Sequence, residues 1–115
     1  MKYGNRKTVY EGITFDSQKE ARRYRELRLL QKAGQISELK LQVPYILIPA
    51  GNGERAVKYI ADFTYVENGR QIVEDVKGYK TRDYILKRKM FKYLYCGEYV
   101  VFREVLLFKK LKENN

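Results

Sequence analysis

A single turn, Asn68-Gly69, constrains the fold of this chain more than any other feature. It separates two runs, residues 58–67 (KYIADFTYVE) and 70–77 (RQIVEDVK), which are rich in β-branched and aromatic side chains. Asn-Gly between two such runs indicates a β-hairpin with a two-residue turn, because a type I′ turn needs positive φ at both central positions. A turn of this length also sets the register, so the strands pair residue by residue outward from it.

That register brings charged residues together. Counting outward from the turn places Asp62 directly opposite Asp75, on one face, with Cβ atoms ~4.5–5.5 Å apart. Lys77 shares this face because it lies two residues beyond Asp75, whereas a slip of one residue would bring Glu74 there instead. Two interpretations stay open. The carboxylates are an ordinary exposed pair neutralised by nearby basic residues, or they hold a hard divalent cation such as Mg²⁺.

Periodicity, caps and glycines predict the other elements. Ser17, with Glu20 three residues later, fits a capping box that begins a helix ending before Gly34. Residues 81–95 read as a second helix with Thr81 as its N-cap. Further strands are expected at 9–15, 41–48 and 99–108. The expected fold class is α/β, an α-β-β-β-α-β core with a mixed central sheet flanked by helices.

Composition limits the chemistry. No histidine and one cysteine among 115 residues exclude imidazole catalysis, histidine metal sites and a zinc site. A net charge of +10 favours a polyanionic partner, nucleic acid before an anionic membrane. No apolar run approaches the ~18 residues that a membrane span needs, and we expect no signal peptide. We expect a cytoplasmic protein with one domain at 9–110, between a basic arm at 1–8 and a polar tail at 111–115.

Glu20 has two roles open to it. Besides closing the capping box, it lies at the edge of the helix face that carries Tyr24 and Leu27, by i, i+4, i+7 spacing. That face should pack on the sheet, so a carboxylate in the first helical turn could reach the hairpin site. The spacing permits this without requiring it. Gln42 is a lesser candidate for assisting the site, because a strand glutamine more often faces solvent or an edge.

These residues resemble a known signature. Asp62, followed by Asp75-Val76-Lys77, is similar to the motif of the PD-(D/E)XK (restriction-endonuclease-like) nuclease superfamily, with Ala61 where proline often precedes the aspartate. Members share an α-β-β-β-α-β core. The stretches FDSQKEARRYREL and YIADFTYVENGRQIVEDVKGYKT look more closely like a family of small phage and prophage proteins placed in that superfamily. Similar small phage members include Holliday-junction resolvases. The resemblance covers roughly residues 3–108.

The resemblance implies a role for each residue. Asp62 and Asp75 would ligate Mg²⁺ or Mn²⁺ with help from the Val76 carbonyl. Glu20 would bind a second metal ion or orient a water. Lys77 would position or polarise the attacking water and offset charge in the transition state. The implied activity is a metal-dependent endonuclease acting on branched or duplex phage DNA inside the bacterial host cell, leaving a 5′-phosphate and a 3′-hydroxyl.

Basic residues that follow this site are candidates for holding nucleic acid. The second helix starts just after Lys77, so its N-terminal end should lie near the site and favour phosphate. For each residue, a solvated helix face is an equally good interpretation. Arg23 is added from the solvent side of the first helix. Tyr79 and Tyr84, next to the site, are candidates for contact with sugar or bases. The basic candidates are Lys80, Arg82, Lys87, Arg88, Lys89 and Arg23.

Two rival functions stay open. One is a catalytically inactive nucleic-acid-binding module that keeps the nuclease fold. The other is a basic structural phage protein that binds another protein. Lack of Mg²⁺ or Mn²⁺ binding would favour the first, and lack of salt-dependent affinity for DNA or RNA the second. For the nuclease we expect DNA in preference to RNA, and a homodimer, because cutting two strands with one small site per chain favours two copies.

Overall fold

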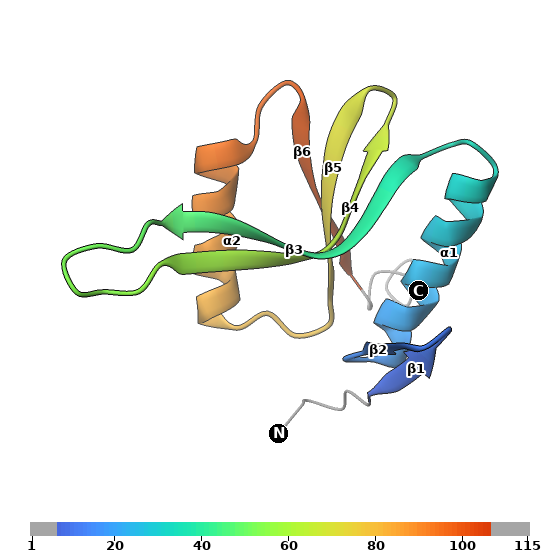
Figure 1. Ribbon diagram of the computed structural model, residues 1–115, viewed down its shortest axis with the longest axis horizontal. Helices are drawn as coiled ribbons and strands as arrows, with labels where there is room; N and C mark the ends of the chain where they lie inside the picture. Colours follow the sequence, from blue (N-terminus) through green and yellow to red (C-terminus); the bar gives the residue numbers. More distant parts are fainter. Residues whose placement is uncertain (1–6, 107–115) are drawn as a thin grey trace, which may run out of the picture.

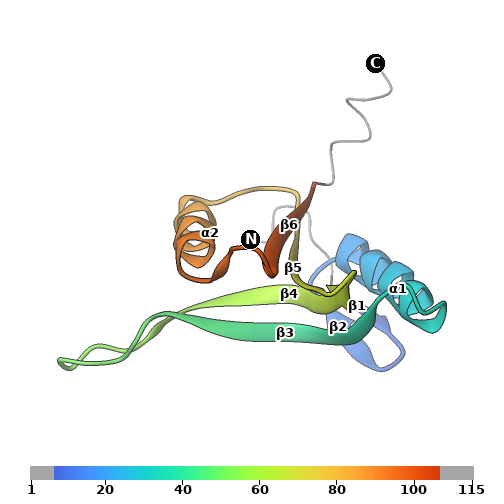
Figure 2. The same cartoon turned by 90° about the horizontal axis from the view of Figure 1, so that it is seen from above.

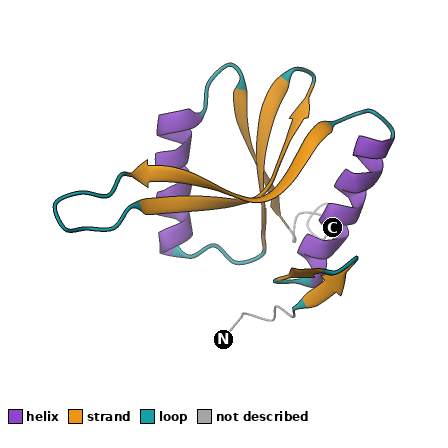
Figure 3. Cartoon of the chain, viewed as in Figure 1, coloured by secondary structure: helices purple, strands orange, loops and turns teal. Residues whose placement is uncertain are grey.

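The computed structural model describes residues 7–106, which form two helices and six strands in the order β-β-α-β-β-β-α-β (Figures 1 and 3). The predicted α/β class and the α-β-β-β-α-β core are confirmed. Residues 1–6 of the expected arm, the tail at 111–115 and the end of the last predicted strand lie outside the described residues. The elements are β1 (Thr8–Tyr10), β2 (Ile13–Phe15), α1 (Gln18–Lys32), β3 (Ser37–Ile48), β4 (Val57–Glu67), β5 (Arg70–Lys77), α2 (Arg82–Tyr95) and β6 (Val100–Leu106).

The main sheet has the order β3-β4-β5-β6 and is mixed, since β6 runs parallel to β5 while the other pairs are antiparallel. The Asn68-Gly69 turn has φ values of 52° and 76°, as the hairpin prediction requires. The predicted register is also confirmed, from the pair next to the turn to Phe63 opposite Glu74. The next step in this register would pair Asp62 with Asp75, and the ladder ends one residue before it.

One strand prediction was wrong, and another placed the start of its strand too late. The single strand expected at 9–15 is a separate hairpin, in which β1 pairs with β2 across Glu11-Gly12, both with positive φ. A glutamate is an uncommon residue in that conformation, so this turn carries a weaker signal than Asn-Gly. The strand expected at 41–48 begins earlier, at Ser37, because the alternation of more and less exposed residues continues back through Leu39; a register shift lies between Ser37 and Lys40.

The core has two parts, one against each helix. Phe63 and Tyr65 belong to the cluster packed against α1, whereas Tyr59 and Ala61 belong to the cluster packed against α2. The two helices lie toward opposite ends of the sheet, and Figure 2 shows β3 and β4 running side by side past α2. Strand β4 therefore passes from one core to the other at Asp62. No helix within the described part of the chain is long and apolar enough to cross a membrane.

Candidate active site

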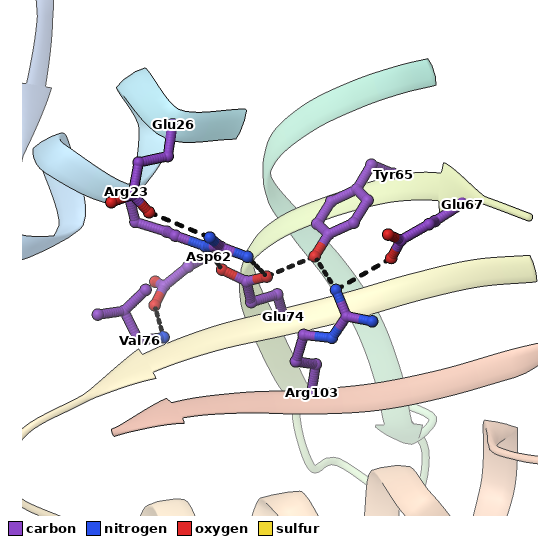
Figure 4. A network of polar contacts seen from close by, with 8 residues as sticks. All are labelled: Arg23, Glu26, Asp62, Tyr65, Glu67, Glu74, Val76 and Arg103. Atoms are coloured by element: carbon purple, nitrogen blue, oxygen red, sulfur yellow. Dashed lines mark hydrogen bonds and ion pairs between the residues drawn. The ribbon is translucent and has the colours of Figure 1, made fainter. Parts of the chain in front are cut away.

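Asp62 lies where both neighbouring ladders are interrupted. On the β3 side the pairing skips Gln42, whose φ of 52° is left-handed. On the β5 side the antiparallel ladder ends at Phe63 opposite Glu74. The Asp62 carboxylate instead accepts a hydrogen bond from the backbone N–H of Val76, with Oδ2 2.8 Å from the nitrogen (Figure 4). The hydrogen bond from Val76 places the Asp62 carboxylate beside the end of β5.

Asp75 is the most constrained carboxylate of the site and is 1% exposed. The Tyr59 hydroxyl donates to its Oδ2 over 2.5 Å. Its Oδ1 is buried and accepts no hydrogen bond, and Lys77 Nζ lies 3.4 Å away as its ion-pair partner. A buried carboxylate oxygen without a donor is costly, so each one calls for an explanation. A hard cation would satisfy this oxygen, since such ions prefer carboxylate ligands.

Glu20 takes both of the roles that the sequence left open. Its backbone N–H donates to the Ser17 hydroxyl, which caps α1, over 3.1 Å. Its carboxylate is nearly buried and accepts a hydrogen bond from the Gln42 amide over 3.3 Å. Burial, followed by the charges of Asp16 and Asp75, raises the pKa of Glu20 to about 7. The structure therefore brings Glu20 and Gln42 to the site.

Burial and neighbouring carboxylates oppose the ionisation of Glu20 and of Asp62. Burial first, then the neighbouring Asp75 and Glu20 carboxylates, raises the pKa of Asp62 to about 9. No three or more His, Cys, Asp or Glu side chains between residues 7 and 106 already form a group able to hold a metal ion. A cation here would therefore rest on Asp62 and Asp75, with water or phosphate oxygens completing its shell, which suits Mg²⁺.

The structure corrects the predicted position of Arg23. It was expected on the solvent side of α1, but its Nε and Nη2 lie 2.6 and 3.0 Å from the carboxylate of Glu74 (Figure 4). Glu74 is 0% exposed and also accepts from the Tyr65 hydroxyl. The same guanidinium donates to Glu26. Arg23 lies beside the apolar stripe, and its long side chain lets it reach the sheet. It is a structural ion-pair residue rather than a solvent-facing one.

The other basic candidates lie on or beside α2 and differ in their partners. Lys80 and Arg88 both pair with Glu104 on β6, at 3.3 and 2.8 Å. Glu104 was missed from the sequence, and the β5–β6 register that sets it beside Asp75 would have located it. Lys87 pairs with the neighbouring Asp83 on the same helix. The remaining two, Arg82 and Lys89, are exposed.

Of the two tyrosine candidates beside the site, one is buried and one is exposed. Tyr84 was a candidate for contact with sugar or bases, but only 8% of it is exposed. Its hydroxyl donates to Glu104 over 2.5 Å. Tyr79 is 61% exposed and remains accessible to a ligand.

Comparison with known proteins identifies the family. A family model described as "Protein of unknown function (DUF1064)" matches residues 1–113. The chain belongs to the DUF1064 family. Comparison with curated proteins gives no match. Among solved structures, protein VC1899 from Vibrio cholerae is similar, with a TM-score of 0.50 and 20% identity over 87% of this chain and 30% of that one. The chain spans less than a third of that protein, and the likeness concerns the fold alone.

In this DUF1064 protein, Asp62→Asn should stabilise the metal-free fold. Asparagine keeps an oxygen for the Val76 N–H and removes a carboxylate from beside Asp75, so the free energy of unfolding should rise by about 1 kcal/mol in chelator. Because the folded-state pKa is raised from 3.8 to about 9, the wild type loses stability as the pH rises through this window. The gain should therefore be larger at pH 8 than at pH 5.

Urea denaturation at both pH values measures this gain. Asp83→Asn serves as the matched control, because that carboxylate is 76% exposed and its pair with Lys87 is worth little. An Asp62→Asn protein no more stable than wild type at pH 8 would show that the carboxylates of the site do not repel one another.

Proposed function

We propose that this DUF1064 protein is a metal-dependent endonuclease that hydrolyses phosphodiester bonds in DNA. The observation that carries the proposal is the buried carboxylate of Asp75. One of its oxygens accepts a hydrogen bond from Tyr59, whereas the other accepts none and has Lys77 as its ion-pair partner. The charge of Asp75 contributes to the raised pKa values of both Asp62 and Glu20, so these carboxylates lie close to one another. Two or three carboxylates beside one lysine are a suitable set for hard-cation chemistry on a phosphate.

Each side chain has a distinct task in this proposal. Asp62 and Asp75, with the Val76 carbonyl, would hold Mg²⁺ or Mn²⁺. The cation would supply Lewis acidity and lower the pKa of a water molecule. Lys77 would orient that water and offset the negative charge that develops on the phosphate. Glu20, held by Gln42, would orient a water or bind a second ion.

The charge of the chain supports a nucleic-acid substrate. The net charge is +10, and α2 begins five residues after Lys77 with its N-terminus carrying the exposed Arg82. A helix N-terminus and exposed guanidinium and ammonium groups bind phosphates without reading bases. We therefore propose branched or duplex DNA, in preference to RNA, as the substrate. Cutting both strands would take two copies of the chain, so a homodimer forms part of the proposal.

Cleavage assays test the proposal directly. The purified protein should cut one or more members of a panel of four-way junction, linear duplex, single-stranded DNA and RNA when Mg²⁺ or Mn²⁺ is present. Chelator should abolish cleavage, and added metal should restore it, because the carboxylates alone supply no Lewis acid. End-labelled products on a denaturing gel report position and end chemistry. No cleavage of any substrate with either metal ion would refute the proposal.

A second candidate function is a nucleic-acid-binding module without catalysis. The observation that favours it is the lack, between residues 7 and 106, of a ready-made group of three metal ligands. Calorimetric titration with Mn²⁺ separates the two functions. A nuclease should bind Mn²⁺ in the wild type and not in Asp75→Asn, whereas a binding module should show salt-dependent DNA affinity and no Mn²⁺ binding.

A further inference from the structure

Lys77 lies between a carboxylate and an aromatic ring. Its Nζ is 3.4 Å from Asp75 Oδ1 and 4.4 Å from the centroid of the Tyr84 ring. The side chain is 27% exposed, so solvent is within its reach. A lysine has four rotatable bonds, and an ammonium that must act on one atom needs something to hold it. The face of an aromatic ring attracts a cation, and the Tyr84 ring presents its face to this ammonium.

Tyr84 is itself fixed at three points. Its backbone N–H donates to the N-cap Thr81 over 3.1 Å, the residue as a whole is only 8% exposed, and its hydroxyl donates to Glu104 Oε2 over 2.5 Å. A phenylalanine would fill the same space. The hydroxyl bond is what a phenylalanine lacks, and it sets the tilt of the ring toward Lys77.

Glu104 is a firm anchor for that hydroxyl. It lies on β6 beside Asp75 in the parallel register, and it pairs with Lys80 and Arg88. Burial acts to raise the pKa of Glu104, but hydrogen bonds from Tyr84 and the two cations outweigh it and hold the pKa below its usual value. Burial, followed by the bond to Glu104, raises the pKa of the Tyr84 phenol. Glu104 therefore stays an acceptor while Tyr84 stays a donor.

We propose that Tyr84, anchored by Glu104, is a positioning residue that holds the ammonium of Lys77 beside Asp75. Its catalytic consequence rests on the proposed nuclease function, whereas the placement of Lys77 does not. Lys80 and Arg88, which sequence reasoning assigned to nucleic acid, take part in this arrangement by holding Glu104. A series of contacts thus links Glu104 on β6 to the Tyr84 ring on α2, and that ring to Lys77 at the end of β5.

Nuclear magnetic resonance tests the placement without substrate or metal. Protons above an aromatic face are shielded, so the ε-methylene signal of Lys77 should lie upfield of the other lysines in protein with ¹³C-labelled lysine. Loss of the signal in Lys77→Arg assigns it. The upfield shift should disappear in Tyr84→Leu and be partly kept in Tyr84→Phe. Tyr93→Leu, at an 87% exposed tyrosine on the same helix, should leave it unchanged.

Cleavage kinetics test the consequence. Tyr84→Leu should lower kcat about tenfold or more, with KM within about twofold of wild type, and Tyr84→Phe should recover part of the loss, because misplacement of a catalytic group slows chemistry more than binding. A shielded Lys77 signal lost in Tyr84→Leu, in a protein that cuts nothing, would support the placement and refute the nuclease. An unshielded signal in wild type would overturn the inference, as would one unchanged in Tyr84→Phe and Tyr84→Leu. Tyr84→Phe retains the ring, so the test stands even if Tyr84→Leu fails to fold.

Discussion

Asp75→Asn should lower the single-turnover cleavage rate about a thousandfold or more while leaving DNA affinity within a few-fold. The substitution keeps an oxygen to accept from Tyr59 but removes the charge on the buried oxygen that lies 3.4 Å from Lys77. Loss of a metal ligand removes both the activated water and the stabilised charge, and each tenfold loss corresponds to about 1.4 kcal/mol of barrier. Lys77→Ala should lower the rate about a hundredfold or more by removing the ammonium alone.

Affinity should hardly change, because one site lysine contributes little to the binding of a chain with a net charge of +10. Fluorescence anisotropy at two salt concentrations measures this separately from the rate. Lys58→Ala is the matched control, at an exposed lysine of β4 to which the proposal gives no role, and it should cleave as wild type does. If Asp75→Asn and Lys77→Ala also cleave as wild type does, the catalytic groups lie elsewhere.

The hairpin was predictable because its register depends on one local signal. Asn68-Gly69 fixes the pairing, and from it the approach of Asp62, Asp75 and Lys77 follows by counting. The way in which Asp62 reaches the site does not follow. Asp62 is paired in neither ladder, and Gln42 on the neighbouring strand has a positive φ although glutamine has no particular preference for that conformation. Two ladders are interrupted at one point, and no local pattern encodes that.

The supporting residues were missed for a different reason. Glu104 acts at the site because β6 lies parallel to β5, and a parallel pairing across an intervening helix is set by tertiary packing rather than by a turn. Tyr84 was predicted to contact a ligand, because a sequence does not show where a hydroxyl points. The sequence therefore identifies the carboxylates and the lysine, and tertiary structure supplies what holds them.

Arg23→Met should lower the free energy of unfolding by about 3–5 kcal/mol. The Glu74 carboxylate is 0% exposed, and Arg23 is the cation that contacts it, through Nε and Nη2. Methionine would fill much of the space but leave the carboxylate charged, buried and without a counter-ion. The total free energy of unfolding of a domain of this size is about 5–15 kcal/mol, so most of the variant should be unfolded at moderate urea concentrations. Arg22→Met, at the exposed neighbouring position, should change stability by less than about 0.5 kcal/mol.

A double variant separates two causes of destabilisation: the loss of the Arg23–Glu74 attraction, and the burial of a Glu74 charge that has no partner. Glu74→Gln removes the buried charge and keeps an oxygen to accept from the Tyr65 hydroxyl. Arg23→Met combined with Glu74→Gln should therefore be more stable than Arg23→Met alone, because most of the damage in the single variant is an uncompensated buried carboxylate. Urea denaturation of the four proteins completes the cycle. Equal stability of the single and double variants would mean that the cost comes from lost packing of the arginine stem, and that the ion pair contributes little.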